Sequence, residues 1–155
     1  LLLDIIMVAI EVPDLYPLAL LSATALPFVT SFVMGGKVMS ARTRLNVPLP
    51  NLYAVPGVHD KADEFNRVQR GHQNMLETVG SVIAATAVGG LRYPRLASGF
   101  ALAYCIGNYF YLKGYADTSK DVNRARYTHP LAVIKPIGML GSVVTATTVC
   151  VIMLM

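Results

Sequence analysis

The distribution of charged residues is the feature of this sequence that most restricts its fold. The chain carries 13 Lys and Arg and 9 Asp and Glu among its 155 residues, and these charges are clustered. Residues 15–36 and 96–112 contain no charge, and residues 131–155 contain only Lys135. A helix needs about 20 apolar residues to cross a bilayer, and a charge at the bilayer centre costs roughly 2.5 kcal/mol or more. The pattern therefore predicts membrane-spanning helices.

A fourth apolar stretch, residues 78–91, is too short to span a bilayer alone. Its 14 residues carry no charge. At about 1.5 Å per residue they extend roughly 21 Å, whereas the hydrocarbon layer is about 30 Å thick. The helix must therefore begin upstream and carry Arg70, Asn74 and Glu77 into or near the membrane. Polar side chains at that depth are candidates for a functional site by default.

The four stretches, with a composition of 54% hydrophobic and 14% charged residues, predict an all-α fold. We expect an integral membrane four-helix bundle in a single domain, residues 1–155, with helices at roughly 15–42, 61–89, 94–116 and 129–154. Lys135 is expected to extend its ammonium back to the membrane interface. Cys105 and Cys150 lie in apolar helices and are interpreted as buried packing residues. The His and Cys spacings indicate no metal site.

The basic residues indicate how the bundle is oriented. They are concentrated in the first and third connections between helices, and only Arg92 and Arg95 flank the second. The positive-inside rule then makes the first and third connections cytoplasmic. Both termini would lie on the other side, consistent with Asp4, Glu11 and Asp14 near the N-terminus, which has no basic region typical of a signal peptide. The net charge of +4 follows from this topology, so we expect no nucleic-acid partner.

Two polar stripes mark the second and third helices. Helical spacing places each set along one helix face; the sets are Arg67, Arg70, Asn74 and Glu77, and Tyr104, Asn108, Tyr111 and Tyr115. A guanidinium, an amide and a carboxylate faced by tyrosine hydroxyls can bind a small zwitterion that has carboxylates and an amine. The alternative interpretation is an interhelical polar network with an interfacial belt of tyrosines.

Small residues recur at four-residue spacing in the third and fourth helices. They are Gly99, Ala103 and Gly107, and Gly138, Ser142 and Ala146. Such spacing allows two helix backbones to approach closely. The pattern is compatible both with packing inside one chain and with oligomerisation.

Four segments resemble one known family of membrane proteins. They are VMSAR at 38–42, FNRVQRGHQNMLE at 65–77, AVGGLRYPRLASG at 87–99 and YLKGYA at 111–116. The chain resembles the MAPEG family of glutathione-using membrane enzymes over residues 15–155, and most closely its type 3 microsomal glutathione transferases. It is also similar to the leukotriene synthases. This resemblance implies a homotrimeric four-helix membrane bundle with glutathione bound between adjacent subunits.

The resemblance also implies which residues act. Glutathione, as co-substrate, would be held by Arg42, Arg70, His72, Asn74, Glu77, Tyr111 and Tyr115. An arginine after the tyrosines of the third helix would stabilise the glutathione thiolate, and the candidates are Arg124, which we prefer as the catalytic residue, and Arg126. Two positions depart from the family pattern. Asn108 stands where several relatives have arginine, and Thr78 where some have tyrosine.

The implied reaction is conjugation of glutathione to an apolar electrophile, or reduction of a lipid hydroperoxide. The expected partners are glutathione, a hydrophobic lipid-like substrate and membrane lipids, and the expected location is the endoplasmic reticulum or the outer mitochondrial membrane. Two alternatives remain open. One is a non-catalytic MAPEG-fold subunit of a larger membrane complex, which Asn108 favours; the other is an eicosanoid synthase, against which the AVGGLRYPR turn argues.

Overall fold

A computed structural model describes residues 11–155, and the expectations for the first ten residues, including Asp4, lie outside the described part. The described chain is all-helical. Its elements are α1 (Tyr16–Arg44), α2 (Ala62–Gly90), α3 (Pro94–Tyr115), α4 (Val122–Ala125), the 3₁₀ helix η1 (Pro130–Val133) and α5 (Ile134–Leu154). The four long helices agree with the all-α bundle expected from the sequence. The short helix α4, inside the third connection, was not expected.

Local sequence signals account for the helix ends. Proline stands in the first turn of α1 and of α3, where its missing N–H costs nothing. Acidic side chains, Asp63 and Glu64, lie in the first turn of α2, where the helix dipole favours negative charge. The carboxylate of Asp121 caps α4 by accepting a hydrogen bond of 3.0 Å from the amide of Asn123.

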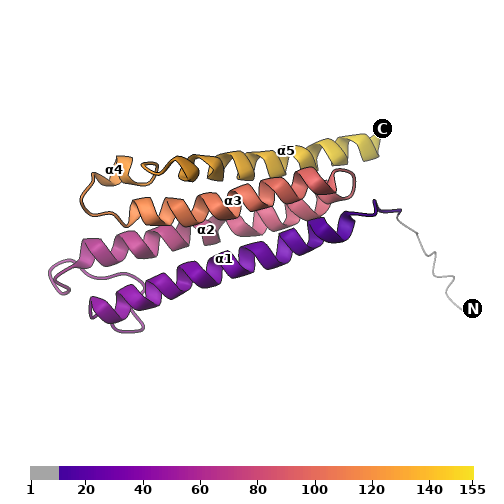
Figure 1. Ribbon diagram of the computed structural model, residues 1–155. Coiled ribbons are helices and arrows are strands. Elements are labelled where there is room, and N and C mark those ends of the chain that lie inside the picture. Colours follow the sequence, from indigo (N-terminus) through magenta and orange to yellow (C-terminus); the bar gives the residue numbers. More distant parts are fainter. Residues whose placement is uncertain (1–10) are drawn as a thin grey trace, which may run out of the picture.

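The long helices run side by side, with the loop of residues 45–61 and α4 at one end of the bundle and the C-terminus at the other (Figure 1). Helices α2 and α3 pack against each other in the middle. α1 packs on both of them from one side, and α5 packs on both from the opposite side. The first and third connections, which carry most of the basic residues, therefore share one end.

The outer surface of the bundle is apolar. Phe28 and Phe32 on α1 are 71% and 75% exposed, and Val144 on α5 is 63% exposed. In contrast, several polar side chains are buried inside, among them Asn108 and Ser142. Both α1 and the continuous η1–α5 segment are long and apolar enough to cross a membrane. This distribution suits a bundle that faces lipid.

Close backbone contact joins α3 to α5. A Cβ atom at Gly107 would overlap the backbone of Lys135, and one at Gly138 would overlap the backbone of Phe100 and Tyr104. At Gly99, in contrast, a Cβ would meet no atom within 4 Å. Two of the small residues singled out in the sequence therefore pack the helices of one chain together.

The loop of residues 45–61 is fixed to the bundle by hydrogen bonds. The buried guanidinium of Arg42 donates to the carbonyl oxygens of Val47, at 3.0 Å, and Asn51, at 2.8 Å. The side-chain amide of Asn66 accepts from the amide of Ala54 at 2.7 Å and donates to the Ala54 carbonyl at 2.9 Å. These contacts hold the loop against α1 and α2.

Candidate functional site

Three polar side chains predicted as ligands follow one another along α2. Arg70 and Glu77, two turns apart, form an ion pair in which Nη1 of Arg70 donates to Oε1 of Glu77. Each of the two side chains is 42% exposed, so the pair lies on an open face of the bundle. Asn74 lies between them on the same stripe and is partly buried. The hydroxyl of Tyr53, in the loop of residues 45–61, faces the Arg70 guanidinium.

Lys135 lies at this site, and the expectation that it extends to the membrane interface is wrong. Only 6% of the residue is exposed. Its Nζ donates a hydrogen bond to Oδ1 of Asn74 and lies 4.0 Å from the centroid of the Tyr111 ring. The close approach of α5 to α3 at Gly107 holds the Lys135 backbone against α3 and directs the side chain inward. The ammonium therefore joins α5 to predicted ligands on α2 and α3.

The tyrosines of α3 form an aromatic cluster beside this lysine. The ring of Tyr111 stacks on that of Tyr115, with centroids 5.7 Å apart, and meets the edge of Tyr127 at 5.5 Å. The Tyr111 hydroxyl faces the guanidinium of Arg126. Nε of Arg126 is enclosed and has no hydrogen-bond partner among the described residues. The guanidinium of Arg126 therefore lies beside Tyr111, one of the predicted ligands.

Arg124, which we prefer over Arg126 on the basis of the family resemblance, has a different position. It lies in α4 and is exposed, whereas Arg126 is partly buried. Arg124 and Arg126 are two residues apart on a short helical turn, so their side chains point in different directions. In the described structure, the arginine beside Tyr111 is therefore Arg126.

Two predicted ligands lie on the other side of α2. Nε2 of His72 is 3.3 Å from the hydroxyl of Ser31 on α1. Arg42, also on α1, is occupied by the two carbonyls of the first loop and stacks over the Phe65 ring at 4.9 Å. Within one chain these two side chains do not meet the Arg70–Glu77 face.

Part of each polar stripe packs the bundle. The Tyr104 hydroxyl donates to the Met75 carbonyl at 3.0 Å and shares a hydrogen bond of 2.7 Å with Thr78. Asn108 is fully buried and donates to the Tyr104 carbonyl at 2.9 Å, while its Oδ1 has no partner among the described residues. Arg67 donates to the carbonyls of Asp117 at 3.1 Å and Lys120 at 3.0 Å. Tyr104, Asn108 and Arg67 therefore form hydrogen bonds within the bundle, in agreement with the alternative interpretation of the stripes as a polar network.

The comparison with protein families decides what kind of bundle this is. The MAPEG family matches residues 20–154. This chain belongs to the MAPEG family. MAPEG proteins are membrane four-helix bundles, so the chain is an integral membrane protein. Most members are glutathione-dependent enzymes, and they include glutathione transferases, peroxidases and leukotriene synthases.

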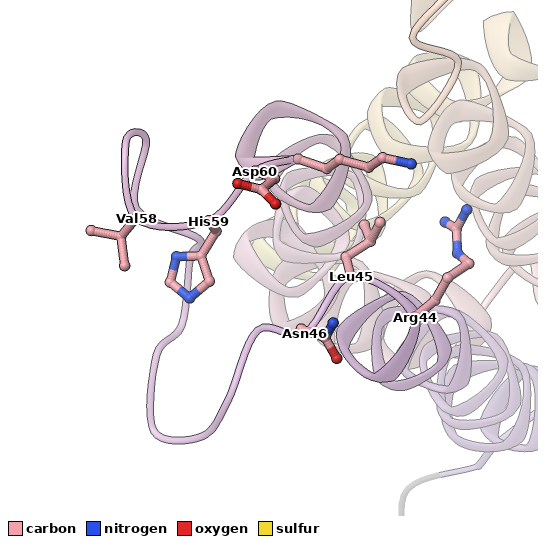
Figure 2. A pocket seen from close by; sticks show the side chains of 7 residues that line it. Arg44, Leu45, Asn46, Val58, His59 and Asp60 are labelled. Atoms are coloured by element: carbon pink, nitrogen blue, oxygen red, sulfur yellow. The ribbon is translucent and has the colours of Figure 1, made fainter.

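The pockets described next lie away from the Arg70–Glu77 face of this MAPEG chain. A pocket of about 320 Å³ lies at the base of the first loop. Figure 2 shows Arg44, His59 and Asp60 among the side chains that line it. None of the predicted glutathione ligands lines it. Nδ1 of His59 accepts a hydrogen bond of 3.0 Å from the amide of Val55, so this imidazole helps to fold the loop. Among residues 11–155, no cluster of His, Cys, Asp and Glu suits a metal ion.

An apolar groove runs between α1 and α3 and reaches the bundle surface. Two pockets along it share Val33 and Tyr109 as lining residues, and Lys37 and Lys113 line one of the two. Leu26, Leu102 and Ile106 line the other pocket, which has almost no polar surface. Cys105 is buried beside this groove as expected, but Cys150 is exposed on α5, so its interpretation as a buried packing residue is wrong.

Proposed function

We propose that this MAPEG protein is a membrane-bound glutathione transferase that joins glutathione to hydrophobic electrophiles. The observation that carries the proposal is the convergence of Arg70, Asn74, Glu77, Tyr111 and Arg126 on one face of a MAPEG bundle. Glutathione is a small zwitterion with an ammonium, two carboxylates and a thiol. Each of these groups finds a complementary side chain on this face.

The ion pair on α2 suits the γ-glutamyl end of glutathione. Glu77 can accept hydrogen bonds from the ammonium, and the guanidinium of Arg70 can bind the neighbouring carboxylate through two parallel hydrogen bonds. The two side chains are half-exposed and already paired with each other. Glutathione binding would replace this ion pair by two new ones, one from each side chain to the ligand, so no charge would be buried without a partner. Asn74 and Tyr115 would complete this part of the site.

The thiol requires a cation, and the geometry supports Arg126 in this role in place of Arg124. A thiol with a pKa near about 8.5 is mostly protonated at neutral pH, and a fixed positive charge nearby favours the thiolate. Arg126 faces the Tyr111 hydroxyl and keeps an unpartnered Nε, whereas Arg124 is exposed. An arginine stays charged at any physiological pH, so it suits this function.

The reaction follows from the chemistry of the thiolate. Its sulfur attacks an electrophilic carbon, the carbon–sulfur bond forms, and the leaving group departs with its electron pair or an epoxide ring opens. The same thiolate can attack a peroxide oxygen. The hydroperoxide is then reduced to an alcohol, and a second glutathione yields the disulfide and water. Both reactions need an activated thiolate next to the apolar region through which the substrate arrives. We therefore propose that the same site also has peroxidase activity.

We propose that the working form is a homotrimer with glutathione between subunits. The support is that Arg42 and His72 lie on the side of α2 opposite the Arg70–Glu77 face, while that face is open in a single chain. A neighbouring copy could cover it with its own α1 and α2. The first and third connections would be cytoplasmic in the endoplasmic reticulum or outer mitochondrial membrane, and the lipid-like substrate would arrive from the bilayer.

Steady-state kinetics of two arginine variants test the proposal. Arg126→Ala is expected to lower kcat for conjugation by about a hundredfold, the usual effect of removing one group that stabilises a developing or fixed anion. Arg124→Ala is the matched control and should keep its kcat within about twofold, because a surface arginine contributes little. Equal losses in the two variants, or a loss only in Arg124→Ala, would contradict the assignment.

A second candidate function is a non-catalytic subunit of a larger membrane complex. It is favoured by Asn108, which stands where several relatives have arginine and is fully enclosed. Purification in mild detergent separates the two candidates. The enzyme should appear as a homotrimer that binds glutathione, whereas a complex subunit should copurify with other membrane proteins and should not bind glutathione at millimolar concentration.

A further inference from the structure

The buried ammonium of Lys135 is a charge that the proposed chemistry leaves without a function. A charge buried in a membrane bundle is costly and persists where it is paired. Among the described residues, the single hydrogen-bond acceptor of Nζ is Oδ1 of Asn74. The ammonium also lies over the face of the Tyr111 ring, in a cation–π contact. Both partners belong to the set proposed to bind glutathione, and they lie on different helices.

The lysine fixes the orientation of the Asn74 amide. An ammonium has three donors and no acceptor, so the atom of Asn74 that faces it must be the carbonyl oxygen. The NH₂ group then points away from Lys135, toward the side of α2 where Glu77 lies within reach of the amide. Without the lysine the amide could rotate and present either atom, because both orientations fit the same space.

The charges around the site indicate which ligands it suits. Arg70, Arg126 and Glu77 are charged groups that lie near Lys135. Together these four side chains carry three positive charges and one negative charge, a net charge of +2. Glutathione in its thiolate form carries two carboxylates, one thiolate and one ammonium, a net charge of −2. Lys135 therefore supplies one of the two excess positive charges that balance this ligand.

We propose that Lys135 is a positioning residue of the glutathione site: it holds the Asn74 amide with its NH₂ group outward, as a donor to a carboxylate of the ligand. This inference rests on the proposed function, because it names glutathione as the ligand. It adds a residue of α5 to a site otherwise built from α2, α3 and the third connection. The close contact between Gly107 and Lys135 then has a function as well, since it sets the depth of the ammonium.

Calorimetric titration of the purified full-length protein with glutathione tests this inference without any second substrate. Lys135→Met removes the donor and should raise the Kd at least about tenfold, the value of one hydrogen bond to a charged group. Lys135→Gln removes the charge but keeps an NH₂ donor that can face Oδ1 of Asn74, so it should raise the Kd clearly less than Lys135→Met does. Lys113→Met is the matched control: this exposed lysine lies above the Phe110 ring, 5.7 Å from its centroid, and should leave the Kd unchanged.

A further variant covers the case in which Lys135→Met does not fold. Asn74→Asp keeps an oxygen for the buried ammonium but replaces the outward NH₂ donor with an acceptor. It should fold and should weaken glutathione binding at least about tenfold.

Three results would overturn the inference. They are an unchanged Kd in Lys135→Met, equal losses in the Met and Gln variants, or wild-type affinity in Asn74→Asp. Equal losses would mean that the charge acts without orienting the amide. Failure of the unaltered protein to bind glutathione is a separate result, which contradicts the proposed function itself.

Discussion

Replacing Gly138 with alanine should destabilise the bundle, although alanine is the better helix former. Gly138 lies in α5 where that helix crosses α3. A Cβ atom there would lie 2.8 Å from Cα of Tyr104 and would overlap the Tyr104 nitrogen and the Phe100 carbonyl oxygen. These neighbours are backbone atoms of a central helix, so no side chain can rotate away to make room. The two helices must separate.

The size of the effect follows from two opposing terms. Inserting a methyl group into a filled contact costs about 1–3 kcal/mol. The gain in helix propensity from Gly to Ala is about 1 kcal/mol. The net loss is therefore about 0–2 kcal/mol. Gly99→Ala is the matched control on α3, because a Cβ there meets nothing within 4 Å, and it should be stabilising by up to about 1 kcal/mol.

Thermal unfolding in detergent measures both variants against the unaltered protein. Because the gain in helix propensity is common to both alanine variants, they should differ by the packing cost of about 1–3 kcal/mol, or about 2–12 °C in Tm for a chain of this size. Gly138→Ala should have the lower Tm. Equal Tm values, or a higher Tm for Gly138→Ala, would refute the close contact between α3 and α5 on which the position of Lys135 depends.

Three further predictions concern other contacts. Arg67→Met should free the third connection, since it removes two hydrogen bonds to the carbonyls of Asp117 and Lys120; trypsin should then cut after Lys120 faster, and an unchanged rate would contradict this. Tyr104→Phe should cost about 1 kcal/mol of unfolding free energy and should couple with Thr78→Val in a double-mutant cycle; strict additivity would show that the 2.7 Å contact contributes nothing. Hydrogen bonds from Ser119 lower the pKa of Asp117, so this carboxylate stabilises the fold above the ordinary carboxyl pKa and loses that contribution as the pH falls through its lowered value. Ser119→Ala should bring the pKa of Asp117 back toward the ordinary value in a carbon-13 NMR titration, and an unshifted pKa would contradict the assigned cause.

The fold was largely predictable because a membrane bundle is determined by where charges are absent. The charge map predicts four helices, and the acidic first turn and prolines predict where they begin. α4 could not be anticipated, because four residues carry no periodic pattern and its start depends on one capping contact, that of Asp121. The exposure of Cys150 could not be anticipated either, because α5 is apolar around its whole circumference and sequence alone does not show which side packs inward.

The arrangement of the candidate site's side chains was predictable on α2 and less so elsewhere. Helical spacing along α2 is enough to align Arg70, Asn74 and Glu77. The inward direction of Lys135 depends on how closely α5 approaches α3, which is a tertiary property. The one indication in the sequence was that Lys135 is the single charged residue of the apolar stretch 131–155. Likewise, the choice between Arg124 and Arg126 depends on the turn of α4.

The central claim is that the protein binds glutathione and holds it as the thiolate. The most direct measurement is the ultraviolet difference spectrum of the purified protein saturated with glutathione at pH 6.5, where about 1% of a free thiol with a pKa near 8.5 is ionised. We predict a thiolate absorption band of about one equivalent per occupied site, which Arg126→Ala abolishes while glutathione still binds. Bound glutathione that remains a thiol, or no binding at millimolar glutathione, would contradict the account.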